Sequence, residues 1–163
     1  MKTPASVHGH PIHPMLVTVP IGLWLFSFVC DLLFILGSGD PVWKTVALYC
    51  MAGGLVGALL AAVPGVIDLI SLRHAPAGRV GLTHMALNLT VVGIYAVNLF
   101  FRMQSDQPAN SLVWLSAFAL ALLVVSGWLG GRMVYELGVG VSASERAARR
   151  ETERSVRMAS RGT

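Results

Sequence analysis

Residues 10–36 read HPIHPMLVTVPIGLWLFSFVCDLLFIL, with two histidines and two prolines set directly before a long apolar run. From Met15 onward the run exceeds the roughly 18 apolar residues that mark a helix long enough to cross a bilayer. It is too long for the apolar core of a cleaved signal peptide, and no cleavage site of small residues follows it. We therefore predict a retained transmembrane helix with both histidines at its entrance.

Three further stretches of the chain have the same character. Apolar residues make up 55% of the 163 residues and charged residues only 12%, and the charges avoid these stretches. The predicted spans are 15–36, 44–70, 80–102 and 111–136. The fold class that follows is all-α, an integral membrane bundle of four antiparallel transmembrane helices. We assign residues 1–141 to this domain and residues 142–163 to a basic tail.

The basic residues are distributed unevenly between the two ends of the predicted bundle. One end carries Lys2, Arg73, Arg79, Arg132, Arg146, Arg149, Arg150, Arg154, Arg157 and Arg161. The other end carries only Lys44 and Arg102, which Asp40 and Asp106 offset. Asp31, nearer the outer end of the first span, is interpreted as a helix-end acid that points either into the second loop face or into the bundle. Because basic residues favour the cytoplasmic side, we expect both termini to be cytoplasmic.

The tail and the cysteines suggest no separate activity. The tail has helical propensity but no apolar face, which favours a solvated segment attracted to anionic lipid headgroups. No aromatic residue interleaves its arginines, so we expect no nucleic-acid partner. Two cysteines, Cys30 and Cys50, are too few for a four-thiolate metal site. We favour two buried free thiols over a disulfide between them.

Polar residues occupy one face of the third predicted span. At about 100° per residue they fall within an arc of roughly 80°; they are His84, Asn88, Tyr95, Asn98 and Arg102. Lipid cannot satisfy such groups, so we predict that this polar seam faces the bundle interior. Hydrogen bonding between helices and a hydrated or proton-conducting path remain open as its purpose. Hydrogen bonding between helices is favoured for Tyr95 and Asn98.

The second span presents small residues on one face, namely Cys50, Gly54, Gly57, Ala61 and Gly65, with Asp68 at its end. Such a ridge allows another helix to approach closely and would also suit a homodimer. In the fourth span, Gly127 and Gly131 predict similar close packing. Pro20 and Pro64 each remove a backbone hydrogen bond, so we expect distortions of the first and second spans there.

All five histidines lie towards the predicted cytoplasmic side of the bundle. His13 and His84 should enter the bilayer at similar depth, because the first and third spans run in the same direction. Asp68 approaches the same level from the second span. His10 is expected at this level too, with Glu136 at the end of the fourth span as a further candidate. We therefore predict a candidate site formed by His13 and His84, with His10 and Asp68 as alternates.

Three chemistries would suit this candidate site. His13 and His84 could bind a b-type haem axially, because each comes from a different helix. With His10 or Asp68 they could instead hold a divalent metal such as zinc or iron. Without a metal the same groups could relay protons, since histidine changes charge near neutral pH. In the structural alternative, His8 and His10 are solvated, and His13 caps the first helix with its ring at the headgroups.

Several short motifs carry a family resemblance. They are HPIHPMLV at 10–17, PIG at 20–22, GGRMVY at 130–135 and GVGV at 138–141. With these motifs the chain resembles a bacterial family of small four-span membrane proteins, the domain of unknown function DUF2231. Some members are fused to a Rieske-like iron–sulfur domain, and this implies a redox setting and a place in the inner membrane. The family often has a polar residue or histidine where this chain has Leu137, which argues against a ligand from the fourth span.

From the residues and the resemblance we expect a redox-associated component of the inner membrane that binds haem b or a divalent metal. A redox protein would be its partner, and the lipid bilayer its surroundings. The competing hypothesis is a non-catalytic structural or assembly subunit, whose polar seam only holds helices together. A proton or ion path is the third hypothesis.

Overall fold

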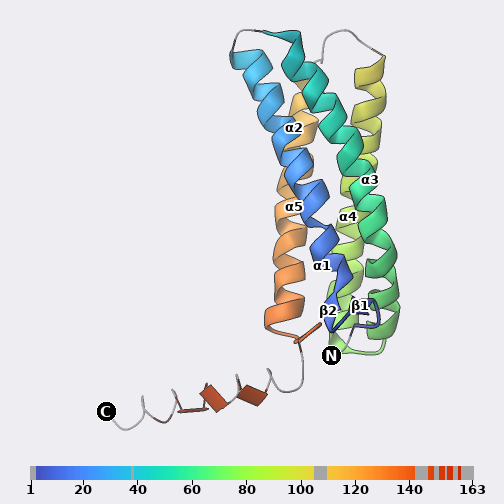
Figure 1. Cartoon of the computed structure of the whole chain (residues 1–163), viewed down its shortest axis with the longest axis vertical. Coiled ribbons are helices and arrows are strands. Elements are labelled where there is room, and N and C mark those ends of the chain that lie inside the picture. Colours follow the sequence, from blue (N-terminus) through green and yellow to red (C-terminus); the bar gives the residue numbers. More distant parts are fainter. Residues whose placement is uncertain are drawn as a thin grey trace.

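The computed structural model describes residues 3–37, 39–104, 110–141, 147–148, 151–152, 154–155 and 158. It is a bundle of long helices with a small hairpin at its N-terminal end (Figure 1). The elements are β1 (Ser6–Val7), β2 (His10–Pro11), α1 (Ile12–Leu16), α2 (Thr18–Leu36), α3 (Pro41–Leu72), α4 (Pro76–Met103) and α5 (Asn110–Tyr135). Four helical stretches are long and apolar enough to cross a membrane, the first formed by α1 and α2 together. The predicted all-α fold with four spans is confirmed.

The second and third spans begin a few residues before their predicted starts. Pro41 and Pro76 each occupy the first turn of their helix, where the missing amide hydrogen costs nothing. Asp40 caps α3, because its carboxylate accepts a hydrogen bond of 2.9 Å from the amide of Val42. These polar and proline residues start the helix but are not apolar. A prediction from hydropathy therefore places the start of the span after them.

The first span is interrupted where the prolines predict a distortion. The break between α1 and α2 falls at Val17, three residues before Pro20, whose nitrogen cannot donate to the carbonyl of Leu16. The amide of Ile21 resumes the helical pattern by donating to the carbonyl of Val17 at 3.2 Å. By contrast, α3 runs through Pro64 as one helix.

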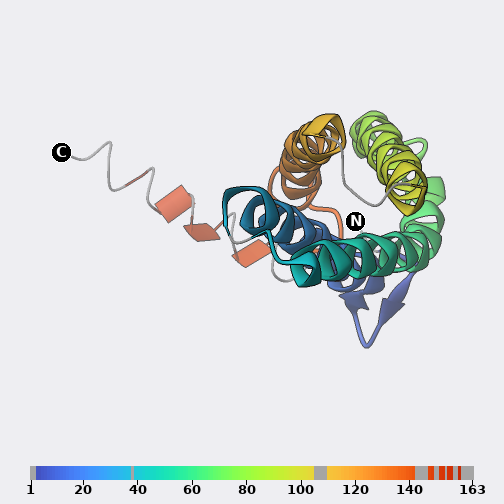
Figure 2. The ribbon, with the colours of Figure 1, turned by 90° about the horizontal axis from the view of Figure 1, so that it is seen from above.

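Contacts between the first and third spans form a line through the centre of the bundle. Viewed end-on, α2 lies against α3, and α4 lies against α5 (Figure 2). Across the middle, three pairs join the first span to α4: His13–His84, Trp24–Tyr95 and Asp31–Arg102. In each of the three pairs the two residues are 71 positions apart in the sequence, as Asp31 and Arg102 are. A constant separation means that the two spans are parallel and in register, because both rise equally per residue.

The small-residue ridge of α3 packs inside the chain, as predicted. A Cβ at Gly54 would overlap the indole of Trp24, and one at Gly57 would lie 3.0 Å from Val19. The ridge therefore receives the first span of the same chain. The expectation for α5 is wrong, since a Cβ at Gly127 or Gly131 would meet nothing within 4 Å.

The structure describes both cysteines but only a small part of the basic tail. Cys30 and Cys50 are both free thiols; Cys30 is buried and Cys50 is half-buried. Most residues of the basic tail, including Arg146, Arg149 and Arg150, lie outside the described part of the chain.

Candidate functional site

His13 and His84 face each other across the bundle near the end that carries the N-terminal hairpin. Their ring centroids are 6.2 Å apart and their planes are nearly perpendicular, at 88°. The Nδ1 atom of His13 lies 2.8 Å from the carbonyl oxygen of Ala61 in α3. The Nδ1 atom of His84 lies 2.8 Å from the carbonyl oxygen of Ser126 in α5. Because a carbonyl can only accept, each Nδ1 carries a hydrogen, and Nε2 is the ring nitrogen with a lone pair that can accept a hydrogen bond or bind a metal.

Two glycines give the imidazoles their room. A Cβ at Gly65 would lie 2.8 Å from Nδ1 of His13, and a Cβ at Gly130 would lie 3.3 Å from Cε1 of His84. The helices α3 and α5 can therefore bring backbone carbonyls to both rings. Gly130 therefore makes the close contact between helices that the sequence predicted for Gly127 and Gly131.

The second ring nitrogen of His84 also has a protein partner. The side-chain amide of Asn88 donates to Nε2 of His84 at 3.0 Å and also to the backbone carbonyl of His84 at 3.0 Å. The hydroxyl of Ser126 lies 3.0 Å from Nδ1 on the other side of the ring. These contacts hold the imidazole in one orientation and fix which nitrogen carries the hydrogen.

His10 and Asp68, the predicted alternate ligands, have other partners in the structure. His10 lies exposed in β2, where it pairs with Val7. Asp68 is buried and accepts a hydrogen bond of 2.9 Å from the amide of Ala5, which fastens the N-terminal segment to α3. Among the residues that the structure describes, no three His, Cys, Asp or Glu side chains come together as a metal site.

The middle pair is a stack of two aromatic rings. Trp24 and Tyr95 lie with centroids 4.3 Å apart and planes only 3° from parallel. The indole Nε1 of Trp24 donates to the carbonyl of Met51 at 3.3 Å. The hydroxyl of Tyr95 is buried without a hydrogen-bond partner in the described residues. The expected hydrogen bond of Tyr95 between helices is therefore not found, and the side chain packs through its ring.

The third pair is a buried ion pair that sequence reasoning missed. Arg102 donates to both carboxylate oxygens of Asp31, at 2.5 and 2.7 Å, and the two side chains are 4% and 1% exposed. Asn98 accepts from Nε of Arg102 at 2.9 Å and donates to the carbonyl of Leu112 at 2.8 Å. The prediction that Asn98 bonds between helices is confirmed.

The charge balance at this end of the bundle does not reveal the ion pair. Of the two acids that offset Lys44 and Arg102 there, Asp40 caps α3 and Asp106 lies outside the described residues. The spacing of the residues in the sequence could have predicted the pair of Asp31 and Arg102. Asp31 follows His13 by the same number of residues as Arg102 follows His84, so parallel spans that pair at one level must pair at the other.

The fold and the cross-bundle pairs define a four-span, all-α integral membrane protein with polar contacts along its core. The chain belongs to the family described as Predicted membrane protein (DUF2231), whose model matches residues 9–143. The match confirms the resemblance that the N-terminal motif suggested. Comparison with curated proteins and with solved structures finds no match.

Proposed function

We propose that His13 and His84 are the protein ligands of a haem b or a metal ion, in a redox-associated membrane component with a redox protein as its partner. The supporting observation is the facing pair of imidazoles, each with Nδ1 bonded to a backbone carbonyl. A histidine that binds metal almost always donates its other ring hydrogen in this way, because the bond orients the ring and strengthens it as a ligand.

The number of available ligands favours haem over a metal ion held by protein side chains alone. Haem b needs only two histidine ligands, whereas a zinc site usually takes three or four protein ligands. In the part of the chain that the structure describes, no third His, Cys, Asp or Glu side chain joins His13 and His84 in a metal site. The pair would therefore supply enough ligands for haem b but too few for zinc.

The chain's own residues would hold such a group and set its properties. Ala61 and Ser126 would orient the ligands through their carbonyls, and Asn88 must first release Nε2 of His84. A bound haem would carry single electrons. The half-buried position of both histidines would limit the access of water and so influence the potential.

A non-catalytic structural subunit is the second candidate, and one observation favours it. Both ring nitrogens of His84 already have protein partners, the Ser126 carbonyl at 2.8 Å and the Asn88 amide at 3.0 Å. In that case the histidine connects α4 to α5, and nothing further binds to it.

A reduced-minus-oxidised visible spectrum, taken with iron analysis on detergent-purified protein expressed with ample haem, tests the proposal. We expect a sharp α-band and about one haem per chain. His13→Ala and His84→Ala should each abolish the band while the protein still inserts into the membrane. His74→Ala is the matched control, because His74 is exposed and its hydrogen bond within the described residues is to the neighbouring Arg73.

Asn88→Ala separates the two candidates. If Nε2 of His84 binds a metal, losing Asn88 removes a competing donor, so the variant keeps its full haem content. If His84 is structural, no form of the protein has the α-band, and Asn88→Ala lowers the thermal stability. A wild-type protein that is silent in the spectrum and free of bound metal would overturn the ligand proposal.

We further propose that both termini face the cytoplasm of a bacterial cell and that the bundle lies in the inner membrane. The N-terminal hairpin, the α3–α4 junction and the end of α5 all lie at one end of the bundle (Figure 1). At that junction Arg73 caps the end of α3, and Arg79 lies in the first turn of α4. Basic residues favour the cytoplasmic side. A green fluorescent protein fused after residue 141 should fluoresce, and alkaline phosphatase fused there should be inactive. The reverse pattern would contradict this orientation.

A further inference from the structure

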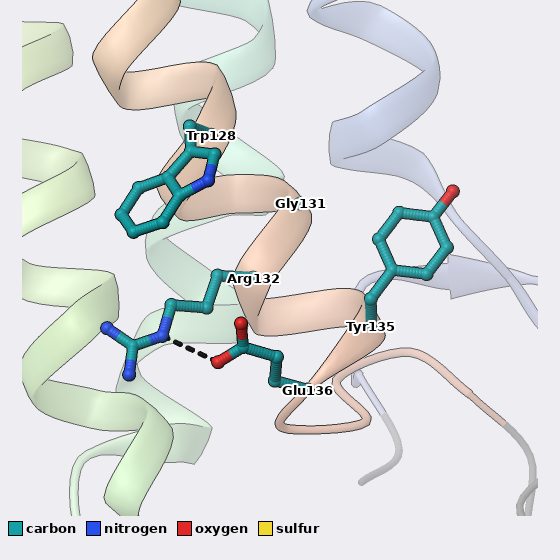
Figure 3. Close-up of a pocket in the computed structure, with 5 residues that line it drawn as sticks. All are labelled: Trp128, Gly131, Arg132, Tyr135 and Glu136. Atoms are coloured by element: carbon teal, nitrogen blue, oxygen red, sulfur yellow. Dashed lines mark hydrogen bonds and ion pairs between the residues drawn. The ribbon is translucent and has the colours of Figure 1, made fainter.

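A shallow hollow lies on the outer face of α5, at the end of the fourth span. It has a volume of about 300 Å³ and is lined by Trp128, Gly131, Arg132, Tyr135 and Glu136 (Figure 3). In this view the side chains of Trp128 and Arg132 lie on one side of the helix and that of Tyr135 on the other, while the carboxylate of Glu136 points toward Arg132. A Cβ at Gly131 would meet nothing within 4 Å, so this glycine leaves the floor of the hollow open.

The hollow holds one charge of each sign. Nε of Arg132 donates to Oε2 of Glu136 at 2.7 Å, with the side chains 42% and 58% exposed. The guanidinium of Arg132 lies 6.0 Å from the centre of the Trp128 ring. Within the described residues, the two terminal nitrogens of Arg132 have no hydrogen-bond partner, and neither has Oε1 of Glu136. The pair therefore still offers donors for an anion and an acceptor for a cation.

The surroundings of the hollow are lipid, because α5 is a membrane span and these side chains point outward. A helix end lies at the level of the headgroups, where tryptophan and tyrosine are enriched because one edge of the ring is apolar and the other polar. Any hollow on such a surface is filled by lipid atoms, and at this level by the headgroup and glycerol region.

We propose that this hollow binds the headgroup of phosphatidylethanolamine. Arg132 would bind the phosphate through its terminal nitrogens, and Glu136 would accept hydrogen bonds from the primary ammonium group. Phosphatidylglycerol offers Glu136 no cation. Phosphatidylcholine offers a quaternary ammonium without a hydrogen to donate. The arrangement of charges therefore fits the zwitterion with a primary amine best.

Native mass spectrometry of the protein released from nanodiscs tests this site, with the three lipids present in equal amounts. We expect the wild-type protein to retain phosphatidylethanolamine about threefold to fivefold over the other two lipids, as expected of partly exposed ionic contacts. Gly131→Leu should remove that preference by filling the hollow. Gly127→Leu is the matched control, since Gly127 lies one turn away with equally open surroundings and does not line the hollow.

Glu136→Gln gives an independent reading of the charge arrangement. It should shift retention from phosphatidylethanolamine towards phosphatidylglycerol, because Arg132 still binds phosphate while the ammonium group loses its charged acceptor. Retention of the three lipids in equal amounts by the wild-type protein would overturn the proposal. So would an equal effect of Gly131→Leu and Gly127→Leu, with both variants shown to be folded by circular dichroism.

Discussion

Replacing Arg102 with methionine is expected to lower the free energy of unfolding by about 3–5 kcal/mol, as for other buried ion pairs that lose one partner. The change leaves the Asp31 carboxylate, which is 1% exposed, without its counter-ion. Asn98 also loses the donor bound to its side-chain oxygen. Neither group can turn to water inside the bundle, so the cost of removing each from water is no longer offset.

Unfolding by sodium dodecyl sulfate in mixed micelles, followed by circular dichroism, measures this effect. The matched control is Arg132→Met, because the Arg132–Glu136 pair is exposed and such pairs contribute about 0.2–1 kcal/mol. The double variant Asp31→Leu with Arg102→Met should recover most of the loss, since apolar residues often replace a buried ion pair without cost. A single Arg102→Met variant as stable as Arg132→Met would show that the buried pair does not stabilise the bundle.

Gly54→Ala is expected to cost about 3 kcal/mol, at the upper end of the usual penalty for overpacking. The added methyl group would overlap the indole of Trp24. That ring cannot move aside easily, because it is buried, stacked on Tyr95 and bonded to the carbonyl of Met51. The same unfolding experiment measures the change, and the fluorescence of Trp24 should shift as its stack on Tyr95 is disturbed.

Gly93→Ala is the control for this prediction. A Cβ at Gly93 would meet nothing within 4 Å, and alanine is a better helix former than glycine by about 1 kcal/mol. The same methyl group should therefore be neutral or stabilising in α4 and destabilising in α3. Equal effects of the two substitutions would contradict the close approach of α3 to Trp24.

The candidate site was predictable only in part. The equal depth of His13 and His84 follows from two spans that run in the same direction, and the structure brings these two rings together. Their partners Ala61, Ser126 and Asn88 were not predicted. Two of these contacts are to backbone carbonyls, and any residue type has a carbonyl, so side-chain identity carries no signal for them.

The glycines show a similar limit. The spacing of Gly127 and Gly131 predicted close packing for α5, yet both open onto empty space and Gly130 is the one that faces His84. A glycine pattern marks a helix face that another helix could approach. Which face does so depends on the rotation of the helix, and in lipid an apolar face that points outward costs nothing.

By itself the sequence determined the number of spans, their alternating direction and the inward face of α4. These follow from local properties, because lipid accepts only helices with satisfied backbones and rejects amides, imidazoles and charges on the outer face. Only the tertiary structure decided the register between the first and third spans. That register pairs His13 with His84, Trp24 with Tyr95 and Asp31 with Arg102. The register depends on how closely the first span can approach α3 at Gly54 and Gly65. This is a property of the packing between helices, which the sequence of one span alone does not determine.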